Sequence, residues 1–142
     1  MKALPDNVFV TGQVLPEQLE ALAGQGIKSL IINRPDMEGG PIQPSSEQMG
    51  AAAQELGLQC AYVPMAGGLS HELIEASEMA FREMPRPIVA YCASGMRSAA
   101  LWGFSHVESL GVDGVMDAIG NAGYNLEQIR RPLEDYLKSK SE

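Results

Sequence analysis

Residues Val89 to Trp102 read VAYCASGMRSAALW, and this stretch decides the fold. An apolar run ends on Cys92, small residues follow, and Arg97 opens a helical pattern. A continuous apolar run of this kind is typical of a strand that is buried on both faces of a central sheet. The stretch therefore predicts a strand, a short loop and a helix in succession, with a thiol at the carboxyl end of the strand.

The sequence on either side of this segment alternates short apolar runs with amphipathic stretches. Further strands are expected in NVFVTGQ (7–13), IKSLIINR (27–34) and LQCAYVPM (58–65). Signals for helix starts, breaks and ends lie between and after these runs: Pro16, the Ser45 and Gln48 pair of a capping box, Ser70, Gly111 and Pro132. Strands and helices in alternation predict an α/β fold, in which crossover helices cover the sheet.

Length and charge restrict the class of protein. The chain has 142 residues, so we expect one domain over residues 1–142 with a single core. No apolar run approaches the roughly 18 residues that span a bilayer, which argues against a membrane-embedded protein. Lys and Arg number 10 against 18 Asp and Glu, and the net charge of -8 would repel a polyanion, so no nucleic-acid partner is expected. The start MKALPDNVFV resembles no secretory signal, so a cytoplasmic location is expected.

The cysteines and histidines give no sign of a disulfide framework or a metal site. Two cysteines are too few for such a framework, and we expect both to be reduced. Cys60, inside LQCAYV without a nearby glycine or arginine, is interpreted as core packing. His71 and His106 stand alone, and no Cys/His spacing resembles a zinc site. The sequence therefore predicts neither a metal nor a cofactor.

The residues after the central strand form a candidate anion site. If this loop curls before a helix, its backbone N–H groups and the positive end of the helix dipole converge on one point. The same field and a nearby guanidinium favour a thiolate, so Cys92 is a candidate nucleophile and Arg97 a candidate oxyanion ligand. The alternative is an inert buried thiol. The expected anion-binding residues are Ala93, Ser94, Gly95, Met96, Arg97 and Ser98.

Four segments resemble the phosphatase-like domain of the beta-lactamase hydrolase-like family. They are NVFVTGQVLPEQLEALAGQGIKSLIINRPD (7–36), PSSEQMGAAAQELGLQCAYVPMAGG (44–68), YCASGMRSAALW (91–102) and AGYNLEQIRRPLEDYL (122–137). The resemblance implies the fold of protein tyrosine and dual-specificity phosphatases, a central, mostly parallel sheet of about four to five strands flanked by helices. It also implies that the cysteine loop lies at the carboxyl end of a strand. Some members of the family, alone or fused to a metallo-hydrolase domain, are described as sulfurtransferases.

The loop differs from the phosphatase pattern in its length and in the residue before the cysteine. Four residues separate Cys92 from Arg97. This is one fewer than in phosphatases of this fold, and it is the spacing of rhodanese-type sulfurtransferases. Tyr91 stands where those phosphatases usually carry a histidine. Ser98, by contrast, matches the hydroxyl with which phosphatases stabilise the departing thiolate. Loop length therefore favours sulfur transfer, whereas Ser98 favours phosphate hydrolysis.

A phosphatase also needs a proton donor for its leaving group. The loop that usually supplies it corresponds to MAGGLSHE (65–72), which contains no aspartate. Asp36, in NRPDMEGG after a neighbouring strand, is the candidate general acid, although aspartate after proline is also a common turn residue. His71 and Glu72 are weaker candidates because they would lie in the first turn of a helix. Arg34 either adds positive charge to the pocket or ends a strand in solvent.

Three functions remain open on these grounds, and we rank phosphate ester hydrolysis first. In it, the Cys92 thiolate attacks a phosphate ester held by the loop and Arg97, and water releases the phosphate. In the second, the same thiolate carries a sulfane sulfur as a persulfide, which requires no proton donor. In the third, the loop only binds an anion. The expected partner is a small anion, either a phosphate ester or a sulfane sulfur donor, and the oligomeric state stays open.

Overall fold

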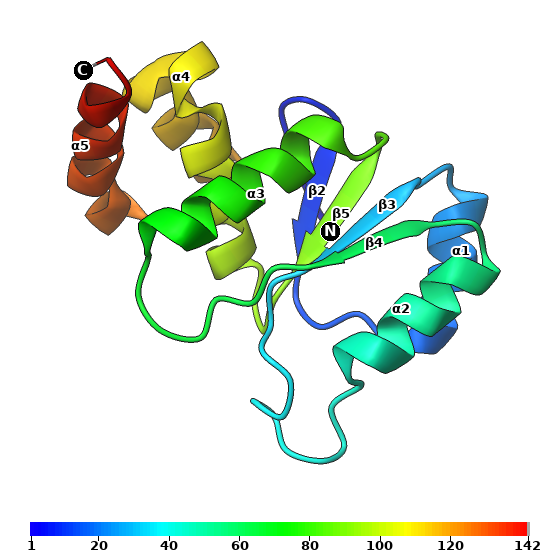
Figure 1. Cartoon of the computed structure of the whole chain (residues 1–142). Coiled ribbons are helices and arrows are strands. Elements are labelled where there is room, and N and C mark those ends of the chain that lie inside the picture. Colours follow the sequence, from blue (N-terminus) through cyan, green and yellow to red (C-terminus); the bar gives the residue numbers. More distant parts are fainter. Residues whose placement is uncertain (142) are drawn as a thin grey trace.

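Helices cover both faces of a five-stranded sheet in the computed structural model, which describes residues 1–141 (Figure 1). The strands are β1 (Lys2–Leu4), β2 (Val8–Thr11), β3 (Ser29–Ile32), β4 (Gln59–Tyr62) and β5 (Ile88–Tyr91). The helices are α1 (Leu19–Gly24), α2 (Ser46–Glu55), α3 (His71–Glu83), α4 (Met96–Asn121) and α5 (Arg130–Lys140), with the short 3-10 turns η1 (Pro16–Gln18) and η2 (Glu127–Ile129). None of the helices within residues 1–141 is both long enough and apolar enough to cross a membrane.

The strand order is β1-β2-β5-β3-β4, so β5 lies at the centre. Strands β2, β5, β3 and β4 pair in parallel, whereas β1 runs antiparallel to β2. Val89 of β5 lies between Phe9 of β2 and Leu30 of β3, and every residue of β5 is buried. A strand covered on both faces is what its continuous apolar run predicts. The structure thus confirms the α/β fold with a mostly parallel central sheet.

Side chains of β5 alternate between two hydrophobic cores. Ile88 and Ala90 belong to the core formed with α3, α4 and α5, which also contains the fully buried Trp102. Val89 and Tyr91 belong to the core formed with α1 and α2. Because β5 is packed from both sides, its carboxyl end is a rigid support for a functional loop.

The helix signals in the sequence are largely confirmed. Ser45 and Gln48 form the capping box of α2, and Ser70 caps α3. Pro132 lies in the first turn of α5, where its missing N–H costs no helical hydrogen bond. Gly111 ends the first helical segment of α4, as expected from the sequence, because its φ of 75° and ψ of 167° are non-helical, and a second helical segment follows at once. Helix α4 therefore consists of two helical segments joined at a sharp bend.

Strand β1 is absent from the predicted elements. It has three residues, two of them exposed, and so carries no periodic pattern that a sequence could reveal. A tight turn folds it back onto β2, and Asp6 and Asn7 adopt positive φ values of 73° and 56° there. Aspartate and asparagine tolerate this conformation better than most residues. The turn chemistry, rather than hydrophobic alternation, creates this edge strand.

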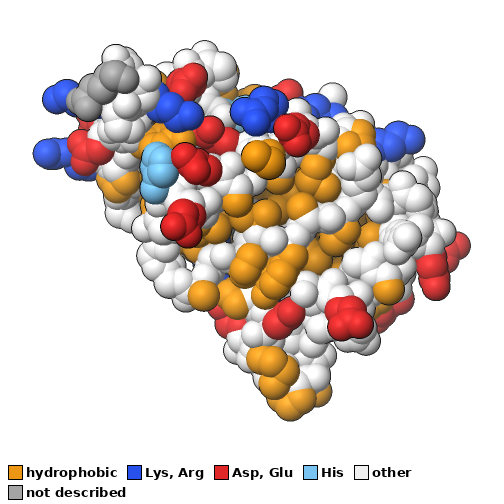
Figure 2. All heavy atoms as spheres, viewed as in Figure 1, with side chains coloured by type: hydrophobic (Ala, Val, Ile, Leu, Met, Phe, Trp, Pro, Cys, Tyr) orange, Lys and Arg blue, Asp and Glu red, His pale blue; other side chains and the backbone are white. Residues whose placement is uncertain are grey.

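Hydrophobic side chains gather on one surface, over β4 and between α3 and α2 (Figure 2). Strand β4 is at the edge of the sheet. Tyr62 of β4 is 43% exposed and Met79 of α3 is 54% exposed. Cys60 lies half-buried in β4, and burial raises the pKa of its thiol. Cys60 is therefore an uncharged thiol packed at the edge of the sheet.

Candidate active site

The loop between β5 and α4 lies at the carboxyl end of the central strand. Cys92 follows β5 directly, and its backbone N–H donates to the Thr11 carbonyl of β2 at 3.3 Å, which extends the parallel pairing. Gly95 precedes α4 as its N-cap residue and has a φ of 95°. The chain thus turns sharply between Cys92 and Gly95, and the first N–H groups of α4 point back towards the thiol.

These N–H groups converge on the sulfur of Cys92. The Gly95 N–H donates to Sγ at 3.0 Å, and the Cys92 side chain is fully buried. Burial raises the pKa of this thiol, but four backbone N–H groups oppose the effect and bring the pKa below its ordinary value of 9.0. They belong to Ser98, Ser94, Gly95 and Arg97. The site therefore favours the thiolate, the form that a nucleophilic cysteine requires.

Two glycines allow the loop to take this shape. A Cβ atom at Gly95 would lie 2.2 Å from the hydroxyl oxygen of Tyr124. A Cβ atom at Gly12, just after β2, would lie 2.9 Å from the carbonyl oxygen of Ala93. A side chain at either position would displace the loop, so the close approach of β2 and of Tyr124 depends on these glycines.

The six residues predicted to bind an anion differ in exposure. Ala93, Ser94 and Met96 are exposed, Arg97 is half-buried, and Gly95 and Ser98 are buried. The Ser94 hydroxyl accepts a long hydrogen bond from the Met96 N–H, at 3.4 Å. The inner surface of the loop is therefore made of backbone N–H groups, and the three exposed residues form its rim.

Arg97 is held by acceptors from two other loops. Its Nη1 donates to Glu38 Oε2 at 2.8 Å and to the Met65 carbonyl at 2.9 Å, and its Nη2 donates to Glu38 Oε1 at 2.7 Å. The hydrogen bond to Glu38 raises the pKa of Arg97, against burial, which lowers it, and the charge of Cys92 raises it further. A guanidinium has five N–H donors, so these bonds leave the Nε–H and one Nη2 proton for an oxyanion.

Glu38 lies between two arginines. Arg34 Nε donates to Glu38 Oε1 at 3.1 Å, and Arg34 Nη1 donates to Gln13 Oε1 at 3.0 Å. The hydrogen bond from Arg97 lowers the pKa of Glu38 and outweighs burial, which raises it, and Arg34 lowers it further. Of the two interpretations left open for Arg34, the structure favours a place beside the site, where Arg34 acts through the Glu38 carboxylate.

A buried chain of hydrogen bonds ties the loop to the neighbouring strands. The Ser98 hydroxyl donates to Asn33 Oδ1 at 2.8 Å, and Asn33 Nδ2 donates to the Val63 carbonyl at 2.8 Å. The backbone N–H of Asn33 also donates to the Tyr91 carbonyl at 2.8 Å. Asn33 thus joins the carboxyl ends of β3, β4 and β5 to the first turn of α4. The Ser98 hydroxyl donates its proton to Asn33, so Ser98 acts on the Cys92 sulfur through its backbone N–H and not through its hydroxyl.

Asp36 lies in the loop after β3 and interacts with α2. Its two carboxylate oxygens accept hydrogen bonds from the backbone N–H and the hydroxyl of Ser46, at 2.7 and 2.8 Å. This carboxylate therefore stabilises the N-terminus of α2. His71 pairs with Glu75 at 2.8 Å on the exposed face of α3, and Glu72 is also exposed. Among residues 1–141, neither His71 nor Glu72 forms a hydrogen bond with the cysteine loop.

Comparison with known proteins gives the family of the chain. Residues 1–109 match the family described as beta-lactamase hydrolase-like protein, phosphatase-like domain. A beta-lactamase hydrolase-like protein of Agrobacterium fabrum is 33% identical over 105 residues, which are 72% of this chain and 24% of that protein. The chain belongs to this family. It spans about a quarter of the length of this curated relative. Residues 1–109, which match the family, include both Cys92 and Arg97.

Solved structures show how this beta-lactamase hydrolase-like domain relates to phosphatases. A candidate phosphatase of Neisseria meningitidis is 28% identical to it with a TM-score of 0.80, and the match covers 95% of this chain and 96% of that one. The core catalytic domain of a PP-IP phosphatase from S. cerevisiae is 16% identical with a TM-score of 0.68, and covers 94% and 83%. At the latter identity the likeness concerns the fold alone. The chain thus has the fold of protein tyrosine and dual-specificity phosphatases, as predicted.

Three residues at the site of this beta-lactamase hydrolase-like domain were not identified from sequence: Asn33, Glu38 and Tyr124. Asn33 ends the strand run IKSLIINR, and a buried polar residue at a strand end was the available signal. Glu38 stands in the same loop as Asp36, and no pattern separates the two carboxylates. Tyr124 lies outside the matched residues 1–109, and tertiary folding alone brings it to Gly95.

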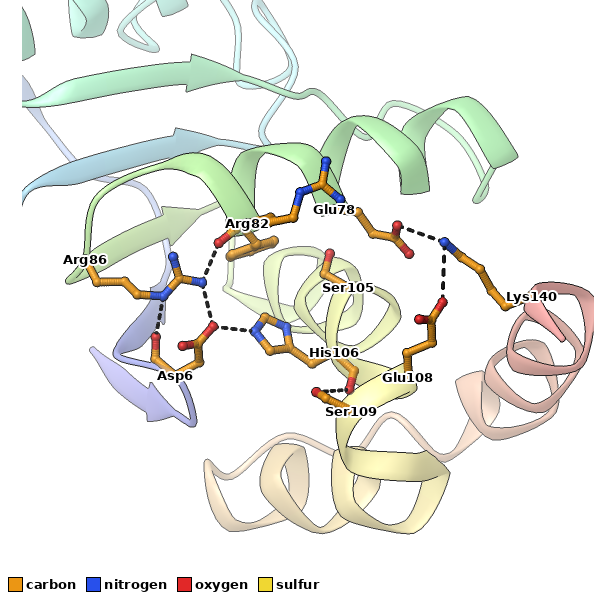
Figure 3. A pocket seen from close by; sticks show the side chains of 10 residues that line it. Asp6, Glu78, Arg82, Arg86, Ser105, His106, Glu108, Ser109 and Lys140 are labelled. Atoms are coloured by element: carbon orange, nitrogen blue, oxygen red, sulfur yellow. Dashed lines mark hydrogen bonds and ion pairs between the residues drawn. The ribbon is translucent and has the colours of Figure 1, made fainter.

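The domain also has a cleft of about 490 Å³ that shares no residue with the cysteine loop (Figure 3). At one end Asp6 forms an ion pair with Arg86 at 2.5 Å, and His106 Nε2 lies 3.0 Å from the same carboxylate; at the other end Lys140 forms an ion pair with Glu78 at 3.1 Å. His106 Nδ1 also lies 2.8 Å from the Trp102 carbonyl. Within residues 1–141, no group of three or more His, Cys, Asp or Glu side chains is arranged to hold a metal ion.

Proposed function

We propose that the chain is a cysteine-dependent phosphatase that hydrolyses small phosphate esters. The observation that carries the proposal is the convergence of four backbone N–H groups on the Cys92 sulfur. The Arg97 guanidinium lies beside them, and its bonds to Glu38 and the Met65 carbonyl leave the Nε–H and one Nη2 proton unused. Such a loop stabilises a thiolate in the free protein and can hold the oxygens of a phosphate when a substrate enters. The phosphatase-like family and fold support the same assignment.

The reaction has two steps. In the first, Cys92 Sγ attacks phosphorus, the S–P bond forms, and the ester P–O bond breaks, with its electron pair and a proton going to the leaving oxygen. The loop N–H groups and the free donors of Arg97 stabilise the charge on the phosphoryl oxygens. In the second, water attacks phosphorus, the S–P bond breaks, and phosphate and the thiolate are released.

Asp36 is the candidate proton donor from the sequence. Both of its oxygens accept hydrogen bonds from Ser46, so an acidic proton on Asp36 would replace one of these bonds. The role of Asp36 as general acid is therefore the least supported part of the predicted site.

The first prediction concerns Cys92→Ser. We expect it to abolish turnover of para-nitrophenyl phosphate, because a serine hydroxyl is not ionised in a field that suffices for a thiol. In the native protein, kcat/KM should rise with pH and level off below the ordinary thiol pKa of 9.0, since the folded protein lowers this pKa. Steady-state kinetics measure both effects, and far-UV circular dichroism verifies that the variant folds. A folded variant with an unchanged rate would refute the proposal.

A second candidate function is sulfur transfer, and the loop length favours it. With four residues between Cys92 and Arg97, the loop is one residue shorter than in phosphatases of this fold. The Cys92 thiolate would attack the sulfane sulfur of a donor such as thiosulfate, and sulfite would leave with the electron pair of the broken S–S bond. The persulfide would then pass its outer sulfur to a nucleophilic acceptor. This route needs no proton donor on the leaving group.

A further inference from the structure

The outer edge of the sheet runs along β4, between α2 and α3. We propose that this edge binds an extended segment of a partner protein, which pairs with β4 as one more strand and has an apolar centre and a basic residue near each end. The surface shares no residue with the cysteine loop, and the proposal does not depend on the phosphatase function. It rests on the backbone of β4, on a hollow at each face of this strand, and on the charges in the two hollows.

Alternate backbone groups of β4 face away from the sheet. The strand pairs with β3, in parallel, and lies at the edge. The N–H groups of Gln59 and Val63 donate to carbonyls of the β3 segment, at 3.0 and 2.9 Å. Because backbone groups point alternately to the two sides of a strand, those of Cys60 and Tyr62 point outward. Pro64 is next on the outer side and has no N–H, so the free donors end at Tyr62.

A hollow lies at each face of β4. One, of about 480 Å³, lies between β4 and α2, and the strand lines it with Leu58, Cys60 and Tyr62. The other, of about 470 Å³, lies between β4 and α3, and Ala61 and Val63 belong to it. Cys60, at the edge, lines both. A strand added beside β4 would send its side chains alternately to the two faces of the sheet, and so into both hollows.

The exposed surface around β4 is apolar. Figure 2 shows hydrophobic side chains gathered over β4 and between α3 and α2. Tyr62, 43% exposed, belongs to the hollow beside α2, and Met79, 54% exposed, belongs to the hollow beside α3. Edge strands often carry charged residues that prevent pairing with another chain, but the sequence of β4, QCAY, contains none. Both the backbone and the side chains of this edge are therefore suited to an added strand.

Each hollow contains one charged side chain, and both are glutamates. Glu47, in the first turn of α2, lines one hollow, and Glu83, the last residue of α3, lines the other. Arg82 lies 3.9 Å from Glu83, but both side chains are exposed, so this pair is weak. Helix α2 leads into β4 and α3 follows it, and both run opposite to the strand (Figure 1). Glu47 therefore lies towards the carboxyl end of β4 and Glu83 towards its amino end.

These charges favour a basic partner over a second copy of the chain. In a two-fold pair of β4 strands, α2 would lie beside α2 and α3 beside α3. Helix α2 has two glutamates and no lysine or arginine, and α3 has four glutamates against one arginine. Like charges would therefore meet, in a chain with a net charge of -8. A basic residue near each end of an incoming strand would instead meet Glu47 and Glu83.

The test measures the binding of two fluorescein-labelled peptides to the chain by fluorescence anisotropy. One peptide has four central valines between two lysines at each end, and the other has glutamates in place of the lysines. We expect a Kd on the order of 100 μM for the lysine peptide. The glutamate peptide should bind at least about tenfold more weakly, because its charges meet those of the two hollows.

Charge reversal in the hollows tests where the peptides bind. In the double variant Glu47→Lys with Glu83→Lys, the preference should invert, so that the glutamate peptide binds more tightly than the lysine peptide. The matched control is Glu20→Lys with Asp117→Lys, which changes the net charge equally at exposed positions of α1 and α4. It should keep the preference for lysine. Far-UV circular dichroism verifies that each variant is folded.

Methylation of peptide nitrogens tests whether the ligand is a strand. Two further lysine peptides are N-methylated, one at the first and third valine and the other at the second and fourth. In a strand paired with β4, one of these sets of N–H groups faces β4 and the other faces solvent. We expect one methylated peptide to bind about tenfold more weakly than the parent and the other to bind as the parent does.

Other outcomes would overturn the proposal. Absence of binding up to millimolar concentration, or equal binding of the lysine and glutamate peptides, would refute it. A preference for lysine that persists in Glu47→Lys with Glu83→Lys would place the peptide elsewhere on the molecule. Equal effects of the two methylation patterns would exclude pairing with β4. A dimer in sedimentation velocity that Met79→Lys dissociates would make a second copy the occupant of this edge.

Discussion

The Cys92 thiolate is stabilised by backbone N–H groups, and the nearby guanidinium of Arg97 depends on Glu38 for its orientation. Glu38 and the Met65 carbonyl take three of the donor contacts of Arg97. The other donors are free to meet an oxyanion above the sulfur. In the proposed reaction, the Glu38 carboxylate thus fixes the geometry of the guanidinium that meets the phosphate.

Glu38→Gln tests this role. An amide keeps the shape of the side chain but turns an acceptor of Arg97 into an N–H group that repels it. We expect KM for para-nitrophenyl phosphate to rise on the order of tenfold, because the guanidinium loses a charge-assisted pair of bonds and is no longer held in place. Separate measurement of kcat and KM detects the change. Glu47→Gln, an exposed carboxylate on α2, is the control and should change neither constant.

A lower KM in Glu38→Gln would contradict this role, because it would mean that the carboxylate competes with the substrate for Arg97. In that case the bidentate pair would be a barrier to binding rather than a support.

At the residue scale, sequence reasoning finds what lies together in the chain. Residues 92–98 are continuous in the chain, and the N–H groups of Ser94, Gly95, Arg97 and Ser98 act on the Cys92 sulfur. Asp36 was chosen because its loop leaves a neighbouring strand at the same edge of the sheet as the cysteine loop, yet its carboxylate binds Ser46. Glu38 and Tyr124 reach the loop from distant segments, so only the folded chain reveals them.

Among the elements, the turn between β1 and β2 is fixed by ion pairs at one end of the cleft in Figure 3. Asp6 Oδ2 accepts from Arg86 Nη2 at 2.5 Å, and His106 Nε2 lies 3.0 Å from the same oxygen. Arg86 also donates to the carbonyls of Phe81 and Met84 near the end of α3. The edge strand, α3 and α4 are therefore held together by one carboxylate.

Asp6→Asn should reduce stability in a pH-dependent way. The hydrogen bond from Arg86 lowers the pKa of Asp6 below 3.8 despite burial, which raises it, and His106 lowers it further. A lowered pKa stabilises the fold at pH values above that of the unfolded carboxyl, and the gain is lost as the pH falls through the folded-state value. We expect a loss of about 1 kcal/mol at neutral pH, a modest figure because Asp6 is partly exposed to screening solvent.

Urea unfolding of both proteins from neutral pH to about pH 3 measures this difference, which should shrink as the carboxyl of the native protein is protonated. Asparagine also tolerates the φ of 73° at this position, so backbone strain does not confound the comparison. Asp117→Asn, on the exposed side of α4, is the control. A difference that stays constant with pH would exclude the ion pair as its cause.

At the scale of elements, local signals give most boundaries and miss those set by tertiary contacts. The capping box at Ser45 and the cap at Ser70 were predicted because their partners are three residues away. Strand β1 is too short to show a pattern. The second segment of α4 folds back after Gly111 because its side chains enter the same core as the first, which a local stop signal cannot show.

For the whole molecule, the alternation of apolar runs and amphipathic helices was sufficient to predict the α/β class. The parallel pairing follows, because each crossover helix returns the chain to the end of the sheet where the preceding strand began. The strand order β1-β2-β5-β3-β4 was not predicted, since every apolar run is compatible with several neighbours. Only the continuous apolar run of β5 indicated a central position, and the structure buries every residue of that strand.

We further propose that the chain folds as one cooperative domain. The two cores meet at the same sheet, and β5 contributes side chains to both. The near-UV circular dichroism of Trp102, in one core, should therefore change with the far-UV signal in a single urea transition. Two separate transitions would show that the α1 and α2 side unfolds independently.

The central claim is that Cys92 attacks phosphorus. The most direct test is the intact mass of the reduced native protein after rapid quenching from an aryl phosphate and, separately, after incubation with thiosulfate, with Cys92→Ser in parallel. The account predicts release of phenol and the mass of one phosphoryl group on the native protein, absent from Cys92→Ser. Gain of one sulfur atom from thiosulfate, without release of phenol from the aryl phosphate, would contradict it and make the protein a sulfurtransferase.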